Sequence, residues 1–171
     1  MLPKLIDKMK PRKIDFKYIP SVKPIQNIQY AKIYPEFEYR LNFDGCSKGN
    51  PGLGGAGAVI YKGYDEICNT SIFVGNNVTN NYSEYSGLIL GLQKAIDLNI
   101  TTLLVQGDSQ IVINQMNGTY KCSSDNLKPL YEKAKELEQN FEKIYYQHIF
   151  RNLNKRADEL ANNFVNKNNI I

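Results

Sequence analysis

The hydrophobic pattern of this 171-residue chain changes type near its middle, and that change limits the folds open to it. In the first half, apolar residues follow strand-like patterns over residues 39–43, 58–61 and 67–74, which predicts an antiparallel meander of three strands. In the second half, stretches with helical spacing alternate with short apolar runs, as in β-α-β units. The sequence therefore predicts a mixed α/β fold.

A glycine-rich run, residues 49–57, lies between the first two predicted strands, and we interpret it as the turn of a hairpin. Within it, Gly52 to Gly57 formally satisfies the G-x-G-x-x-G pattern of dinucleotide-binding turns. That pattern needs a helix directly after the glycines, whereas residues 58–61 predict a strand. We therefore read the run as hairpin glycines, and the missing Gly-Lys-Ser/Thr ending also excludes a P-loop.

The second half of the chain predicts four helices and two more strands. The expected elements are a helix capped by Asn80 or Asn81, a strand over 101–105, a helix over 109–116, a helix from Asp125 through Leu137, a strand over 144–149 and a helix from Asn154 towards Asn166. The complete order is β-β-β-α-β-α-α-β-α. The expected fold class is α/β, with a mixed five-stranded sheet of three antiparallel strands plus two parallel ones, flanked by helices.

Residues 1–38 differ in character from the rest of the chain. They contain five prolines and eight Lys or Arg against four Asp or Glu, whereas residues 39–171 contain thirteen of each charge. We expect a basic, proline-containing arm at 1–38 and one folded domain at 39–171. Contact with a polyanion and simple solubilisation both remain open as the arm's role.

Cysteine usage and apolar runs favour an intracellular protein, and we expect it in the cytoplasm. Cys46, Cys68 and Cys122 are odd in number and have no Cys-x-x-Cys spacing, which argues against a disulfide framework and a zinc knuckle. No apolar run approaches the roughly 20 residues that cross a bilayer. We therefore expect no membrane partner. The sequence also contains no coiled-coil seam, and we expect a monomer.

Four carboxylates occupy positions where an ordinary solvated charge is not expected. Asp44 ends an apolar strand beside Gly45, and Asp108 follows another strand at the end where open α/β sheets bind ligands. Glu84 and Asp158 each lie near the start of a predicted helix. If the two strands are neighbours, all four side chains can share one pocket. Taken singly, each also has an ordinary reading as a turn former, a helix-start charge or an N-cap.

Such a cluster would repel itself unless cations neutralised it. Hard oxygen ligands without nearby Cys or paired His favour Mg²⁺, with Mn²⁺ as the alternative, over zinc. Two ions about 4 Å apart can activate a water and stabilise the leaving oxygen of a phosphodiester. The pattern therefore predicts two-metal phosphodiester hydrolysis.

The sequence strings around these carboxylates resemble type 1 ribonuclease H over about residues 39–166. The strings are 44–52, 79–84, 107–110 and 154–162, and they occur in the family's order with compatible separations. The resemblance implies a ribonuclease H-like sheet of the strand order given above. It also implies a Mg²⁺-dependent endonuclease that hydrolyses the RNA strand of RNA–DNA hybrids and leaves 5′-phosphate and 3′-hydroxyl ends.

Residue roles carry over by matching positions. The resemblance assigns catalytic and metal-ligand roles to Asp44, Glu84, Asp108 and Asp158. The expected substrate-binding residues are Gly45, Asn50, Asn80, Asn81, Ser109, Gln110 and Arg151. Amide side chains among them can meet base edges and sugar hydroxyls, and the 2′-OH distinguishes RNA from DNA.

The chain departs from the bacterial pattern in two loops. Only a short loop lies between Asn117 and Asp125, where bacterial relatives insert a basic helix, so the arm at 1–38 is a candidate replacement. The loop before the last helix resembles the shorter one of plant- and archaeal-type members. We expect His148 to be a strand-end histidine rather than a proton shuttle for the reaction. Arg151 is the alternative helper residue, because a guanidinium can hold a leaving phosphate.

The same motifs also fit two other interpretations of the chain. One is a catalytically inactive module of the same fold that binds hybrids or RNA, which the presence of all four carboxylates disfavours. The other is a remnant of a reverse-transcriptase polyprotein, against which we weigh the initial Met1 and the lack of a polymerase region.

Overall fold

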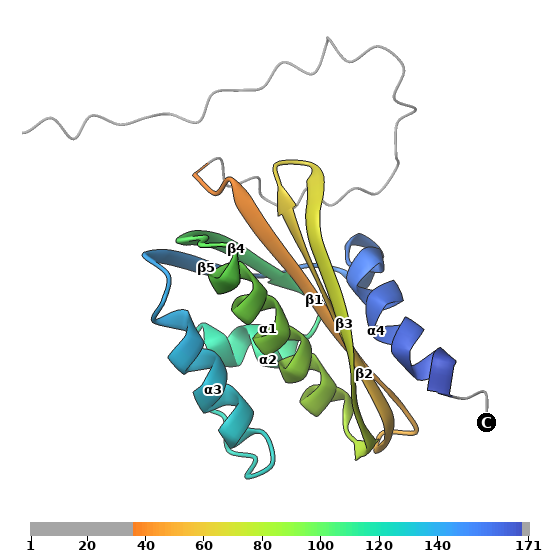
Figure 1. Cartoon of the computed structure of the whole chain (residues 1–171). Helices are drawn as coiled ribbons and strands as arrows, with labels where there is room; N and C mark the ends of the chain where they lie inside the picture. The colour runs from red at the N-terminus through yellow and green to blue at the C-terminus, as the bar shows by residue number, and fades with distance from the viewer. Residues whose placement is uncertain (1–35, 169–171) are drawn as a thin grey trace, which may run out of the picture. The chain divides into compact units, whose positions relative to one another are not determined.

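The computed structural model of the protein describes residues 36–168 (Figure 1). Its elements are β1 (Tyr39–Lys48), β2 (Gly52–Lys62), β3 (Asp65–Val78), α1 (Asn80–Asp97), β4 (Thr102–Gly107), α2 (Gln110–Met116), α3 (Lys128–Glu138), β5 (Lys143–His148), the short 3-10 helix η2 (Arg151–Leu153) and α4 (Lys155–Asn168). This order confirms the predicted succession of strands and helices. The predicted arm lies outside the described residues except for its last three positions.

The five strands form one sheet in the order β3-β2-β1-β4-β5. β2 pairs antiparallel with both β1 and β3, whereas β1–β4 and β4–β5 are parallel pairs. Helices cover both faces, with α1, α2 and α3 on one side and α4 on the other (Figure 1). The predicted fold class is therefore confirmed. None of the described helices is long and apolar enough to cross a membrane.

The larger core lies between the sheet and α1 to α3. Its fully buried members include Leu41, Phe43, Tyr85, Leu88 and Leu92. A much smaller cluster of Val59, Ala157 and Leu160 lies under α4. Among the described side chains, most of the buried apolar residues lie on the α1 side of the sheet. Of the two helices that carry predicted carboxylates, α1 is therefore the more deeply anchored.

The glycine-rich run is not the turn that the sequence predicted. Only Gly49, Asn50 and Pro51 form the turn, and residues 52–57 already belong to β2. Gly57 shows the physical reason, because a Cβ there would lie 2.6 Å from the backbone nitrogen of Ala161 in α4. Glycine in β2 serves the close approach of a helix to the sheet.

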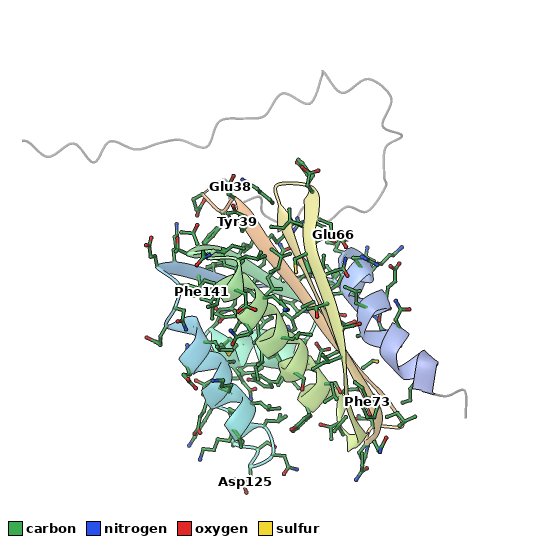
Figure 2. All side chains as sticks on the ribbon, viewed as in Figure 1. Glu38, Tyr39, Glu66, Phe73, Asp125 and Phe141 are labelled. Carbon is green, nitrogen blue, oxygen red and sulfur yellow. The ribbon has the colours of Figure 1, made fainter. Side chains whose placement is uncertain are left out.

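Two predicted helix starts are also wrong. α1 is capped by Thr79, whose hydroxyl accepts a hydrogen bond from the backbone N–H of Tyr82 at 3.3 Å, and Asn80 is already helical. α3 begins at Lys128 rather than at Asp125, which lies in a turn at the lower end of the molecule in Figure 2. Pro129 favours this later start, because its fixed φ suits the first turn of a helix.

Candidate active site at the carboxyl ends of β1 and β4

The register of the two central parallel strands places two predicted site residues next to each other. Phe43 on β1 lies beside Gly107 on β4, so the residues that follow, Asp44 and Asp108, emerge at the same point of the sheet. The sequence predicted that these two residues would meet if the two strands were neighbours. Asp44 does not end its strand as predicted, however, because β1 continues to Lys48 in its pairing with β2. The carboxyl ends of adjacent parallel strands are where open α/β sheets form their sites.

Close backbone packing brings the third carboxylate to this point. A Cβ on Gly45 would overlap the backbone of Ser83 and Glu84, and a Cβ on Gly87 would collide with the carbonyl of Asp44. These two glycines let α1 lie directly on β1. Glu84 therefore reaches Asp44 because the helix backbone itself is close, and its side chain needs no long extension.

Asp44, Glu84 and Asp108 form a compact cluster of oxygen ligands. Each offers one carboxylate oxygen, and these three atoms all lie within 4.8 Å of one another. Asp44 is 4% exposed and Glu84 is 9% exposed. Within the described part of the chain, Oε2 of Glu84 is buried and has no hydrogen-bond partner. An all-oxygen donor set with an unpartnered buried oxygen fits a hard divalent cation.

The electrostatics of the cluster also favour a bound cation. Burial, followed by the charge of Asp108, raises the pKa of Asp44 to about 7, although the backbone N–H of Gly45 donates to its Oδ1 at 2.8 Å and opposes the shift. Burial, followed by the charges of Asp44 and Asp108, also raises the pKa of Glu84 well above its ordinary value. Burial and mutual repulsion disfavour the ionised forms of these carboxylates, and a bound cation would relieve the repulsion.

Asp158 lies beside this cluster but is paired differently. Its Oδ1 accepts a hydrogen bond from Nη2 of Arg151 at 2.8 Å, and its side chain is 30% exposed. Its charge also contributes to the raised pKa of Asp44. The structure thus brings three of the four predicted carboxylates within metal-sharing distance and holds the fourth in an ion pair at their side.

A cavity of about 330 Å³ opens over the cluster. Its lining residues are Asp44, Gly45, Cys46, Ser47, Lys48, Asn80, Glu84, Asp108, Arg151 and Asn162. The predicted substrate contacts Gly45, Asn80 and Arg151 are among them. Lys48 and Asn162 were missed, although both lie inside strings already singled out; Asn162 follows Asp158 by one helical turn, which is the signal that could have revealed it.

The other predicted substrate contacts surround the cavity or lie apart from it. Oδ1 of Asn50 accepts from the backbone N–H of Asn80 at 2.9 Å, and Oδ1 of Asn80 accepts from that of Ser47 at 2.8 Å, so both asparagines brace the β1–β2 turn against α1. Ser109 caps α2. Asn81 and Gln110, in the first turns of α1 and α2, are not among the residues that line this cavity.

His148 ends β5, as the sequence predicted. Its Nε2 lies 3.3 Å from the carbonyl oxygen of Asp108, and its ring meets Phe150 edge to face. The contact involves the backbone of Asp108 rather than its carboxylate. His148 therefore lies behind the site, whereas Arg151 lines the cavity itself.

Comparison with known proteins agrees with this geometry. The family described as Reverse transcriptase-like matches residues 42–164. The Ribonuclease HI of Halobacterium salinarum is 36% identical over 134 residues, which cover 77% of this chain and 67% of that protein. A bifunctional protein of Mycobacterium tuberculosis is 40% identical over 123 residues, and this chain spans only about a third (34%) of its length.

Solved structures show the same fold. The N-terminal ribonuclease H domain of that mycobacterial protein superposes with a TM-score of 0.73 at 37% identity, covering 75% of this chain and 94% of the domain. LC11-RNase H1, solved in complex with an RNA/DNA hybrid, gives a TM-score of 0.71 at 29% identity, covering 75% of this chain and 97% of the other.

Proposed function

Because the chain belongs to the ribonuclease H family, in its reverse transcriptase-like branch, we propose that it is an endonuclease that hydrolyses the RNA strand of RNA–DNA hybrids. The observation that carries this proposal is the cluster of Asp44, Glu84 and Asp108 at the carboxyl ends of the two central parallel strands. Two of these three crowded carboxylates, Asp44 and Glu84, are buried, which a hybrid-binding module without activity would not require.

Asp44, Glu84, Asp108 and Asp158 are the residues that would hold Mg²⁺ or Mn²⁺. Two such ions, when bound, would supply an activated water and stabilise the leaving oxygen, giving 5′-phosphate and 3′-hydroxyl ends. Asp44 and Glu84 are the buried, fixed members of this set. Asp158 is more exposed, and it would be free to hold a metal once its present partner, Arg151, turned to the substrate.

Arg151 then becomes free to bind a phosphate of the RNA strand. Its side chain is 77% exposed and lines the cavity, so its guanidinium can turn from Asp158 to a phosphate without moving the backbone. A guanidinium can hold a phosphate through two parallel hydrogen bonds. We assign the phosphate-binding role to Arg151 rather than to His148, which faces a backbone carbonyl.

Substrate recognition is assigned to polar residues on and around the cavity rim. They are the backbone of Gly45 on β1 and the polar side chains of Asn50 in the turn after β1, Asn80 and Asn81 on α1, Ser109 at the N-cap of α2 and Gln110 at its first position. Amides at these positions can reach the minor groove of a hybrid, where the 2′-OH identifies the RNA strand. The relative solved with an RNA/DNA hybrid supports this class of substrate.

The decisive test compares cleavage of labelled RNA–DNA hybrid and of double-stranded RNA, in Mg²⁺ or EDTA, by the wild-type chain and Asp44→Asn. We expect metal-dependent cleavage confined to the RNA of the hybrid, with none detectable in Asp44→Asn. Asp125→Asn is the matched control, because Asp125 is an exposed acid outside the site. Hybrid binding without cleavage in either Mg²⁺ or Mn²⁺ would refute the proposed nuclease activity and favour the inactive binding module.

We also propose that residues 1–38 form a separate basic arm that strengthens hybrid binding, in a protein that acts as a cytoplasmic monomer. Eight Lys or Arg against four acidic residues give the arm a net positive charge that phosphates attract. Removing residues 1–36 should weaken hybrid binding and flatten its salt dependence, since fewer counterions are released. If a filter-binding titration found the affinity for hybrid and its dependence on salt concentration unchanged, the proposed role of the arm would be disproved. Sedimentation equilibrium tests whether the protein is a monomer.

A further inference from the structure

A buried asparagine lies directly behind the carboxylate cluster. Asn154, between η2 and α4, is 1% exposed. Its amide nitrogen donates hydrogen bonds to the carbonyl oxygen of Phe43 at 2.8 Å and to Oδ1 of Asp108 at 2.9 Å. Its amide oxygen accepts from Nδ2 of Asn42 at 3.3 Å. Both ends of the side-chain amide are therefore engaged, in contacts with β1 and with Asp108.

These contacts connect Asn154 to three of the four carboxylates. It bonds Asp108 directly, and it bonds the carbonyl of Phe43, the residue immediately before Asp44. Its own backbone carbonyl accepts the N–H of Asp158 at 3.1 Å in the first turn of α4. One residue thus links β1, the end of β4 and the start of α4 at the point where each carries a carboxylate.

An amide is the short side chain that suits this position. Both the carboxylate of Asp108 and the carbonyl of Phe43 are acceptors, and an NH₂ group supplies two donors from a single nitrogen. An aspartate would place a third acceptor among them, and an apolar side chain would leave buried acceptors unpaired at about 1 to 3 kcal/mol each. Asn154 also holds one oxygen of Asp108, which leaves the other free to face the cluster.

Asn42 explains which way the amide of Asn154 points. Asn42 is 6% exposed in the middle of β1, and its Oδ1 is buried without a hydrogen-bond partner in the described part of the chain. Such an unpaired acceptor is unfavourable, so packing alone does not account for an asparagine here. Its N–H requires an oxygen opposite, which fixes the NH₂ end of Asn154 towards Asp108.

We infer that Asn154, oriented by Asn42, is a positioning residue that sets the spacing of Asp44, Asp108 and Asp158 and thereby the affinity of the site for divalent cations. This inference rests on the proposed function, because it concerns the same carboxylates. Partners that orient metal ligands typically change metal affinity or activity by about 10- to 100-fold when they are removed.

The test measures Mn²⁺ binding to the full chain by electron paramagnetic resonance, for wild type, Asn154→Ala and Asn42→Leu. We expect the Kd for Mn²⁺ to rise about 10- to 100-fold in Asn154→Ala and by a smaller factor in Asn42→Leu. The Mg²⁺ concentration for half-maximal cleavage should rise in parallel, with the KM for hybrid unchanged. Gln115→Leu is the matched control: this buried amide bonds Tyr85 and the carbonyl of Lys121, so its loss should lower Tm without changing the Kd.

Each outcome decides the inference. A folded Asn154→Ala that binds Mn²⁺ as tightly as wild type overturns it. If that variant does not fold, Asn42→Leu decides, because it leaves Asn154 in place and replaces a side chain whose buried Oδ1 is unpaired by an apolar one of similar size. A wild-type chain that neither binds Mn²⁺ nor cleaves hybrid overturns the proposed function as well, whereas a cleaving wild type with unaffected variants overturns only the role of Asn154.

Discussion

The two helices that contribute carboxylates reach the site by different physical means. On the α1 side, Glu84 is placed by backbone packing at Gly45 and Gly87 and is deeply buried. On the α4 side, Asp158 is placed by polar contacts, through the hydrogen bonds of Asn154 and the ion pair with Arg151. Among the side chains that the structure describes, the larger core lies under α1 and a smaller apolar cluster lies under α4.

This difference teaches which part of the site is fixed and which part can adjust. Closely packed backbone has no alternative arrangement of similar energy, so we expect the α1 side of the site to be rigid; we call the contact of α1 with β1 at Gly45 and Gly87 the rigid α1 wall. A partly exposed ion pair is worth little free energy and can exchange partners readily. Changes on the α1 side should therefore affect folding and chemistry together, whereas changes on the α4 side should affect metal and substrate binding first.

The largest expected effect is that of Gly45→Ala. The new methyl group would overlap the backbone of Ser83 and Glu84, so α1 must move away from β1. We expect a loss of about 1 to 3 kcal/mol in the free energy of unfolding, as for other overpacked cores, together with loss of hybrid cleavage. Urea unfolding and the cleavage assay measure the two effects.

Two alanine variants sharpen this comparison. Gly57→Ala introduces a similar collision with α4, which the smaller cluster allows to shift, so the loss of stability should be smaller. Gly75→Ala on β3 meets only a flexible methyl of Val78 at 3.1 Å and should be nearly neutral. If Gly45→Ala were no more destabilising than Gly75→Ala, the rigid α1 wall would be disproved.

A smaller effect is expected from pH in the metal-free protein. The pKa of Asp44 is about 7 in the folded chain, against 3.8 for an ordinary aspartate, so folding favours its protonated form. Its stabilising contribution is complete below about pH 4 and is lost as pH rises towards about 7. In EDTA, Tm should therefore fall over this range more steeply for wild type than for Asp44→Asn.

Adding Mg²⁺ should reverse this loss. A cation binds the ionised carboxylates of the folded state, so the rise in Tm should be larger near pH 8 than near pH 5. Differential scanning fluorimetry at both values, with and without Mg²⁺, measures it. Parallel Tm curves for wild type and Asp44→Asn would show that the buried cluster does not titrate in this way.

The smallest effect on folding is expected for Arg151→Ala. The ion pair of Arg151 with Asp158 is exposed on the arginine side, so the free energy of unfolding should change by less than about 1 kcal/mol. Cleavage should nevertheless fall, by roughly 10- to 100-fold, because a partner of a metal ligand and a phosphate-binding group are lost together.

Arg156→Ala is the matched control for Arg151→Ala. Arg156 lies in the first turn of α4, shortly after the 3-10 helix η2 that carries Arg151, and neither it nor its partner Glu66 lines the cavity. Glu66 is on β3, on the α4 side of the sheet in Figure 2. Its removal should change stability by a similar amount and leave cleavage unaltered. Equal activity of the two variants would show that Arg151 has no role beyond its surface ion pair.

Much of this molecule followed from local sequence patterns. The strand and helix order, the mixed sheet and the meeting of Asp44 and Asp108 across β1 and β4 were predicted and are confirmed. Asp44 was also predicted to end its strand, which is wrong, because β1 continues to Lys48. The predicted starts of α1 and α3 were wrong. The prediction for the glycine-rich run was also wrong, because a glycine in a strand and a glycine in a turn look alike in the sequence. Only the approach of Ala161 distinguishes the two at Gly57.

The sequence by itself determined which elements form and in what order, because hydrophobic period and turn chemistry depend on residues close together in the chain. Only the tertiary structure decided that Asp158 pairs with Arg151 and that Asn154 holds Asp108. Asn42 and Asn154 lie 112 residues apart, and no local rule specifies such a hydrogen bond. It exists because the parallel strands and α4 converge on one point, where buried donors and acceptors must satisfy one another.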